Sequence, residues 1–160
     1  MNKISGIKKS SEIADITRKK GRLVILTGGC FDILHIGHIR FLEEAKKLGG
    51  NLFILLESDK KVKELKGKNR PIFSQKERAH TLASLVSVDH IIMLPPLANT
   101  KYLEIIEKIK PDIIAAAQND RIIEIKRNQA EKVAAKLIIL PYFKSLSSTK
   151  IASLLAKEDL

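Results

Sequence analysis

Short apolar runs alternate with amphipathic stretches along most of the chain. These runs occupy residues 23–26, 52–56, 90–94, 113–117 and 137–140. Continuous apolar runs of this length, without polar alternation, are typical of parallel strands that are covered on both faces. The pattern therefore predicts an α/β fold, a Rossmann-like, doubly wound sheet of about five parallel strands with helices on both faces.

Helix-start signals stand in front of the amphipathic stretches. Ser74 and Glu77 have the spacing of a capping box, and Ser10 and Ser147 stand where the first and last helices are expected to begin. Residues 1–9 are expected to form a loose basic lead-in. Because no repeat, low-complexity tract or linker interrupts the pattern, residues 1–160 are predicted to form a single domain.

The chain is strongly basic, with 29 lysines and arginines against 18 acids and a net charge of +11. This charge favours an anionic partner, which could be nucleic acid, a membrane surface or nucleotide phosphate. An aromatic content of 4% and the lack of a recognisable nucleic-acid module make nucleic acid the weaker choice. One cysteine excludes an internal disulfide, and without a membrane-spanning run or a signal-peptide pattern we expect a cytoplasmic protein.

The residues that could take part in chemistry are concentrated between the first apolar run and a helical pattern that begins near Ile39. The stretch from Gly28 to His38 contains three glycines, an acid and two histidines at the point where a strand turns into a helix. Backbone N–H groups and the positive end of the helix dipole meet there, which is typical of a phosphate site. His35 and His38 can both face one phosphate, although one could instead cap the helix while the other packs. Zinc is disfavoured because no third ligand accompanies the pair.

The stretch Gly29-Cys30-Phe31-Asp32-Ile33-Leu34-His35-Ile36-Gly37-His38 resembles a known motif. It is similar to the Gly-x-Phe-Asp-x-x-His-x-Gly-His signature of the cytidylyltransferase-like nucleotidyltransferases. From about Ser10 to the last helix, the chain most resembles the heptose 1-phosphate adenylyltransferases of that family. The resemblance implies an enzyme that transfers a nucleoside monophosphate, with ATP favoured over CTP as donor, to a sugar phosphate such as heptose 1-phosphate. Pyrophosphate is the other product.

The resemblance also implies roles for individual residues. The catalytic set is His35, His38, Lys66 and Arg78. The nucleotide-binding set is Gly29, Cys30, Phe31, Asp32, Gly37, Ser147, Ser148 and Thr149. Mg²⁺ is expected as a cofactor held mainly through the triphosphate, with no metal site built from protein side chains. Simpler interpretations remain open, since Lys66 and Arg78 could be surface charges and Ser147 would cap the last helix in any case.

The chain departs from the pattern of the heptose enzymes at four places. Gly28 replaces an asparagine, residues 116–119 replace Lys-Gly-Gly-Asp, and Ser145 replaces a glycine. We hypothesise that the adjacent Lys144 supplies a positive charge to the nucleotide. Glu57 replaces another asparagine, and it could contact a substrate hydroxyl or, as we favour, pair with a neighbouring lysine.

These departures leave the acceptor open. The alternatives are a glycerol-3-phosphate-type cytidylyltransferase, an FAD-synthase-like adenylyltransferase and, outside enzymes, a nucleotide-sensing or nucleic-acid-binding protein. A homodimer is also compatible with the sequence.

Overall fold

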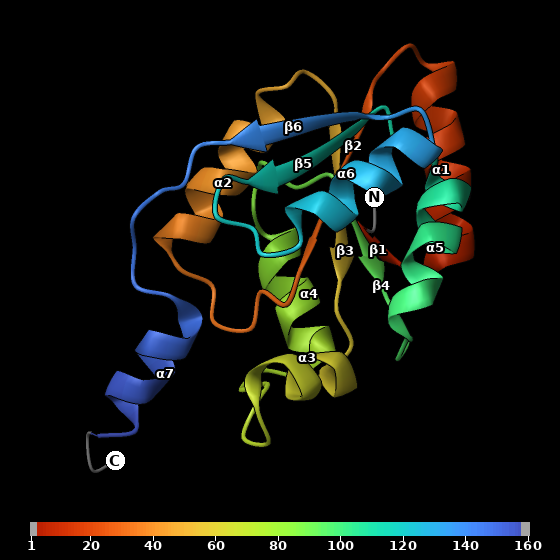
Figure 1. The fold of residues 1–160 in the computed structure, drawn as a ribbon. Helices are drawn as coiled ribbons and strands as arrows, with labels where there is room; N and C mark the ends of the chain where they lie inside the picture. Colours follow the sequence, from red (N-terminus) through yellow and green to blue (C-terminus); the bar gives the residue numbers. More distant parts are fainter. Residues whose placement is uncertain (1–2, 158–160) are drawn as a thin grey trace.

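The computed structural model describes residues 3–157 and contains a six-stranded, all-parallel sheet (Figure 1). The strands are β1 (Ile4–Ser5), β2 (Val24–Gly29), β3 (Asn51–Leu56), β4 (His90–Met93), β5 (Ile113–Ala117) and β6 (Lys136–Leu140). Their order across the sheet is β1-β4-β3-β2-β5-β6. The five apolar runs therefore form the five strands β2 to β6, as the hydrophobic pattern predicts.

Helices cover both faces of the sheet. They are α1 (Ile7–Lys19), α2 (Ile36–Lys46), α3 (Asp59–Lys66), α4 (Gln75–Ala83), the 3₁₀ turn η1 (Asn99–Lys101), α5 (Tyr102–Ile109), α6 (Ile123–Lys132) and α7 (Ser148–Leu155). One core cluster packs α2 and α4 against the sheet through Leu42 and Leu82, and the other packs α1, α5 and α6 through Ala14, Ile106 and Ala130. Figure 1 shows α7 lying apart from these layers. The doubly wound fold predicted from the sequence is confirmed.

The strand order creates a crevice at the carboxyl end of β2. The chain runs from β2 outward to β3 and β4, and then crosses back to β5 on the other side of β2. The connections that leave β2 and β5 therefore turn to opposite faces of the sheet. In open α/β sheets this switch point is where ligands bind.

The amino-terminal segment is more ordered than the sequence pattern indicates. Ile4 and Ser5 pair with Ile91 and Ile92 of β4, and α1 already begins at Ile7. The expected loose lead-in over residues 1–9 is therefore wrong for residues 4–9, while residues 1 and 2 lie outside the described part. A two-residue strand is too short to produce a hydrophobic period, which explains the error. The prediction of one domain over residues 1–160 stays a prediction.

Side chains fasten the strand ends next to the crevice. The amide of Gln75 donates hydrogen bonds to the carbonyl oxygens of Leu56 and Leu94, at 3.0 and 2.8 Å, and so ties the ends of β3 and β4 together. Gln75 begins α4, whose predicted capping box between Ser74 and Glu77 is present. These contacts hold the edge of the sheet from which the site loops emerge. Within residues 3–157, no helix is long and apolar enough to cross a membrane.

Candidate active site

Two histidines stack on each other where β2 turns into α2. His35 occupies the N-cap position of α2, one residue before the helix begins at Ile36 rather than near Ile39. The ring centroids of His35 and His38 are 3.8 Å apart with an interplanar angle of 28°. The His35 side chain makes no capping hydrogen bond, so the alternative in which it serves as a helix cap is wrong. Phe31 packs against His38 with its ring centroid 5.2 Å away.

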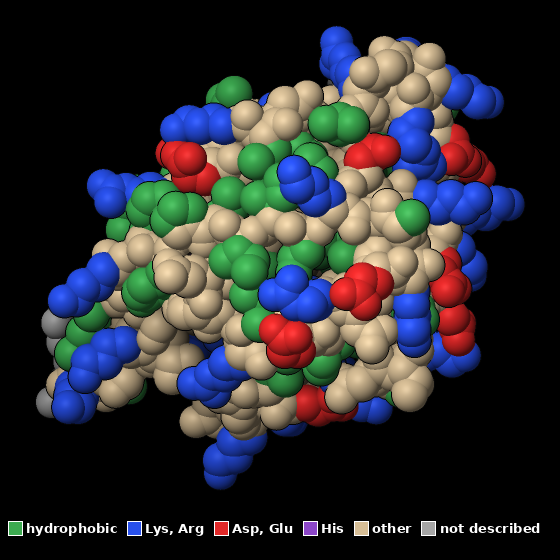
Figure 2. Space-filling model, turned by 45° about the horizontal axis from the view of Figure 1, so that its top comes forward, with side chains coloured by type: hydrophobic (Ala, Val, Ile, Leu, Met, Phe, Trp, Pro, Cys, Tyr) green, Lys and Arg blue, Asp and Glu red, His purple; other side chains and the backbone are tan. Residues whose placement is uncertain are grey.

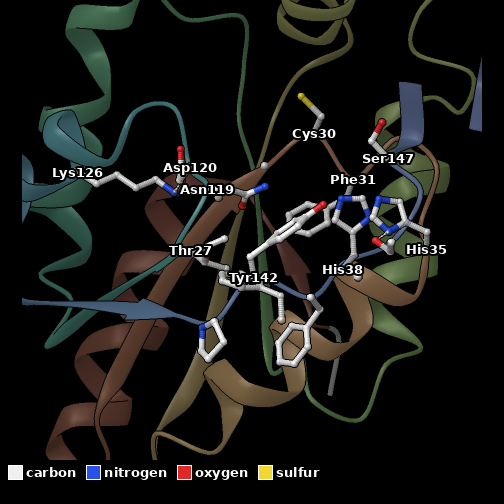
Figure 3. Close-up of a pocket in the computed structure, with 18 of the residues that line it drawn as sticks. Thr27, Cys30, Phe31, His35, His38, Asn119, Asp120, Lys126, Tyr142 and Ser147 are labelled. Atoms are coloured by element: carbon white, nitrogen blue, oxygen red, sulfur yellow. Dashed lines mark hydrogen bonds and ion pairs between the residues drawn. The ribbon is translucent and has the colours of Figure 1, made fainter. Parts of the chain in front are cut away.

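The histidines line a cavity of about 430 Å³ at the switch point (Figure 3). We call it the histidine cavity. Its walls come from the carboxyl end of β2, the first turn of α2, the loop after β5 and the segment that follows β6. Of the predicted residues it includes Gly29, Cys30, Phe31, His35, Gly37, His38, Lys66 and Ser147. The lining as a whole comes from four separate stretches of the chain, within residues 27–41, at Lys66, and within residues 117–126 and 141–147.

Burial keeps both imidazoles uncharged. Burial, together with electrostatic repulsion from His35 and Lys66, lowers the pKa of His38 to about 4. Burial and Lys66 also lower the pKa of His35. Near neutral pH each ring is therefore neutral, with one N–H donor and one acceptor nitrogen. The buried Nδ1 atom of His38 has no hydrogen-bond partner in the described structure. Such a pair can donate hydrogen bonds to a ligand without carrying positive charge.

Lys66 connects the histidine cavity to the last helix. It is the final residue of α3, and its Nζ donates a hydrogen bond to Oγ of Ser148 at 3.2 Å. Oγ of Ser147 accepts a hydrogen bond from the amide of Lys150 and caps α7. Ser147 lines the histidine cavity. Ser148, which is buried, and Thr149 do not line it. The start of α7 is therefore placed to present a hydroxyl and free backbone amides to an anion.

Arg78 lies beneath the site rather than in the histidine cavity. Only 1% of this residue is exposed. Its guanidinium donates to the carbonyl oxygens of Cys30, Glu57 and Phe73 and forms an ion pair with Asp59. These contacts hold the turn after β2 and the end of β3 in place. The contact with phosphate that the family resemblance implies stays a prediction.

Asp32 is fully engaged by the protein. Its carboxylate accepts hydrogen bonds from the amides of Ile72 and Phe73 and from Nε of Arg70, with which it forms a buried ion pair. Asp32 therefore orders the turn by fastening residues 70–73 against it. Within residues 3–157, no group of three or more His, Cys, Asp or Glu side chains could hold a metal ion.

Sequence reasoning missed an ion pair on the wall opposite the histidines. Asp120 follows β5, and its Oδ2 lies 2.6 Å from Nζ of Lys126 on α6, as Figure 3 shows. Both residues line the histidine cavity. The sequence predicts that this segment is a loop at the carboxyl end of a strand, and that position is what could have indicated a site residue there. However, a contact six positions apart across a helix start follows no simple periodicity.

The four departures from the heptose pattern lie at or near the cavity. Ser145 comes close to His35, with 3.4 Å between Oγ and Nδ1, and a Cβ atom at Gly37 would lie 2.3 Å from that hydroxyl. Ser145 can sit there because Gly37 has no side chain. Lys144 is exposed and does not line the histidine cavity, so its suggested contact with the nucleotide stays a prediction.

Glu57 pairs with a tyrosine rather than with a lysine. Its Oε2 accepts a hydrogen bond of 2.7 Å from the hydroxyl of Tyr102, so the expected ion pair is replaced by a neutral donor. Burial raises the pKa of Glu57 and, together with Glu57 itself, that of Tyr102. The two residues are 45 positions apart in the sequence and meet because the carboxyl end of β3 lies next to the start of α5.

Comparison with known proteins places the chain among enzymes. The cytidylyltransferase-like family model matches residues 26–153. A bifunctional protein HldE from Syntrophotalea carbinolica is 39% identical over 103 residues, which cover 64% of this chain and 20% of that protein. An FAD synthase from Thermococcus sibiricus is 39% identical over 142 residues, which cover 87% of this chain and 94% of the synthase.

A solved structure supports the same relationship. The lipopolysaccharide core biosynthesis protein from Thermoplasma volcanium superposes with a TM-score of 0.63 at 27% identity, covering 79% of this chain and all of that one. The chain spans only 20–30% of the length of the HldE proteins that it matches. The family model, by contrast, extends from β2 into α7 and so includes the whole histidine cavity. The chain belongs to the cytidylyltransferase-like family of nucleotidyltransferases.

Proposed function

We propose that the protein transfers AMP from ATP to the phosphate of a small acceptor and releases pyrophosphate. The observation that carries this proposal is the stacked pair His35 and His38, which faces a cavity that Lys66 and Ser147 also line. A sugar phosphate such as heptose 1-phosphate is the first candidate acceptor, because the motif resembles that of heptose 1-phosphate adenylyltransferases and HldE proteins are among the relatives.

The proposed chemistry needs no protein nucleophile. An oxygen of the acceptor phosphate attacks the α-phosphorus of ATP, the bond from that phosphorus to the bridging oxygen breaks, and pyrophosphate leaves. His35 and His38 donate hydrogen bonds to the α-phosphate as charge develops on its oxygens. Lys66 and the start of α7 hold the β- and γ-phosphates, since a cation and free helix amides meet there.

Mg²⁺ would neutralise part of the triphosphate charge in this reaction. We propose that it binds through the phosphates, because the Asp32 carboxylate already accepts three hydrogen bonds from the protein. In this proposal the residues of the chain orient the nucleotide, and the phosphates of the nucleotide coordinate the metal.

FMN is the second candidate acceptor. The FAD synthase of Thermococcus sibiricus is matched over 94% of its length, whereas the HldE relatives are matched over less than a third of theirs. Because this relative is matched over nearly its whole length, it supports a flavin acceptor on grounds independent of the motif.

A matrix of donors and acceptors tests the proposal. ATP and CTP are each combined with heptose 1-phosphate, glycerol 3-phosphate and FMN, and pyrophosphate release is measured with Mg²⁺ present. We expect release with ATP and one of these acceptors, and its loss in a His35→Ala, His38→Ala double variant. Release with CTP alone would replace AMP by CMP as the transferred group, and release from no pair would overturn the proposal.

A further inference from the structure

A second cavity of about 420 Å³ lies against the face of the sheet that α5 and α6 cover. We call it the aliphatic cavity. It shares six wall residues with the histidine cavity, namely Thr27, Gly28, Gly29, Cys30, Asp120 and Lys126. The two cavities therefore meet at the carboxyl end of β2, on either side of the strand that leads to the histidines. A ligand that spans both would have its middle at Gly29 and Cys30.

The walls of the aliphatic cavity are mainly hydrocarbon. Its aliphatic lining consists of Leu26, Leu55, Leu65, Ile106, Ile114, Ile122 and Ile125. The strand residues and Ile106 are buried and form the floor, while Leu65, Ile122 and Ile125 are 60%, 49% and 56% exposed. Single exposed aliphatic residues are common on protein surfaces, but three around one cavity form a surface that a ligand would cover.

Several polar side chains of the aliphatic cavity are engaged with one another. Lys61 donates a hydrogen bond to Oδ1 of Asn99, and Asp120 and Lys126 form an ion pair. The hydrogen-bonded pair Glu57 and Tyr102 contributes to the wall, with Asn99 and Gln129 as the uncharged amides. A sugar with hydroxyls on every carbon would bury several of them against hydrocarbon, where they lose hydrogen bonds to water. A flat aromatic ring system loses little on entering such a site and needs only a few polar contacts at its edge.

We propose that the aliphatic cavity is the acceptor pocket and that it takes a flat aromatic ring whose phosphate reaches the histidine cavity. This inference rests on the proposed nucleotidyl transfer and decides between its two acceptors in favour of FMN. Leu65, Ile122 and Ile125 cover the faces of the ring, and the pair Glu57 and Tyr102 contacts its polar edge. The cavity is of the size that binds drug-like molecules, about 300–1,000 Å³.

Flavin binding and transfer can be measured separately on the full chain. Binding of FMN and of riboflavin, which lacks the phosphate, is followed by flavin fluorescence anisotropy. Ile125→Asp puts a short charged side chain on the pocket wall, and Ile16→Asp is the matched control. Ile16 is on helix α1, is 51% exposed and lines neither cavity.

We expect Ile125→Asp to weaken binding of both flavins by about tenfold or more, because a carboxylate disfavours the apolar ring. Ile16→Asp should bind as the wild type does. Loss of FMN binding with unchanged riboflavin binding would show repulsion of the phosphate alone and would overturn the proposal. So would failure of the wild type to bind either flavin.

Pyrophosphate release separates this inference from the proposed function. If Ile125→Asp lowers release with FMN and the control does not, both stand. If the wild type releases pyrophosphate with heptose 1-phosphate and Ile125→Asp does so equally well, nucleotidyl transfer stands and the acceptor pocket is overturned. If Ile125→Asp abolishes flavin binding but no acceptor yields pyrophosphate, the pocket stands and the proposed reaction fails.

Discussion

His35 and His38 show how one turn can supply donors without charge. Their rings stack at 3.8 Å, and two adjacent imidazolium ions at that distance would repel each other. Burial removes the problem by lowering both pKa values, so that each ring stays neutral. Neutral donors also make weaker contacts with a triphosphate in the ground state, which leaves more of their effect for the charge that develops during transfer.

Substitution of either histidine should act on turnover rather than on folding. We expect His35→Ala and His38→Ala each to lower kcat about 100-fold or more, since in the proposed reaction each histidine is a donor to the transferred phosphate. Steady-state pyrophosphate release gives kcat, and thermal unfolding serves as the control. Near-normal turnover in either variant would contradict the assigned role.

Substitution of Arg78, in contrast, should act on folding rather than on turnover. Arg78→Ala leaves the carbonyl oxygens of Cys30, Glu57 and Phe73 without their donor, and we expect a loss of about 3 kcal/mol or more in the free energy of unfolding. Lys76→Ala, at an exposed position of the same helix, should change stability little. Denaturant titration measures both. A fully stable Arg78→Ala variant with reduced kcat would instead place the guanidinium at the phosphates.

At the scale of elements, the short strand β1 is held by a buried polar cluster. The hydroxyls of Ser5 on β1 and Ser10 on α1 lie 2.9 and 3.0 Å from Nε2 of His90 on β4. The two hydroxyls are also hydrogen-bonded to each other, at 2.9 Å. Three elements that are distant in sequence therefore converge on one imidazole, and burial with the nearby charge of Lys9 lowers its pKa to about 4.

This cluster predicts a pH dependence of stability. The folded pKa of His90 lies below the unfolded value of about 6.5, so the unfolded chain binds the extra proton between these values. His90 therefore contributes full stability above about pH 6.5, and stability falls as the pH drops toward 4. By pH 5 we expect a loss of up to about 2 kcal/mol from His90.

Denaturant titrations at pH 7 and pH 5 measure this effect in the wild type and in His90→Gln, whose amide can still bond to the serines. The variant should lose less stability over the interval. His38 titrates in the same direction, so part of the wild-type slope should remain. An unchanged slope in His90→Gln would contradict the assignment.

At the scale of the molecule, the sheet could be predicted because each of its main strands is a continuous apolar run. The contacts that complete the site could not. Glu57 meets Tyr102 and Asp32 meets Arg70 only once the chain has folded, and no local period relates these positions. Arg78 stands on a helix with few apolar residues, where an inward-pointing arginine cannot be told from an exposed one until the carbonyl oxygens around it are known.

The net charge of the chain, unlike its apolar runs, is a poor indicator of where a ligand binds. On the face drawn in Figure 2, lysine and arginine side chains are scattered among hydrophobic and acidic ones rather than merged into one basic surface. On this face, therefore, the charge of +11 is not gathered into a nucleic-acid interface. Two lysines, Lys66 and Lys126, line the histidine cavity, and the family resemblance points to Lys66.

Cys30 lines both cavities, and it is the single cysteine of the chain. Every copy of the unaltered protein therefore has one built-in chemical reporter at the junction of the two binding spaces. Burial raises the pKa of its thiol, so alkylation by a maleimide should be slow at neutral pH and faster in alkali. Intact-mass spectrometry would then register shielding by any molecule that fills either side, and ligand libraries could be screened without labels or substitutions.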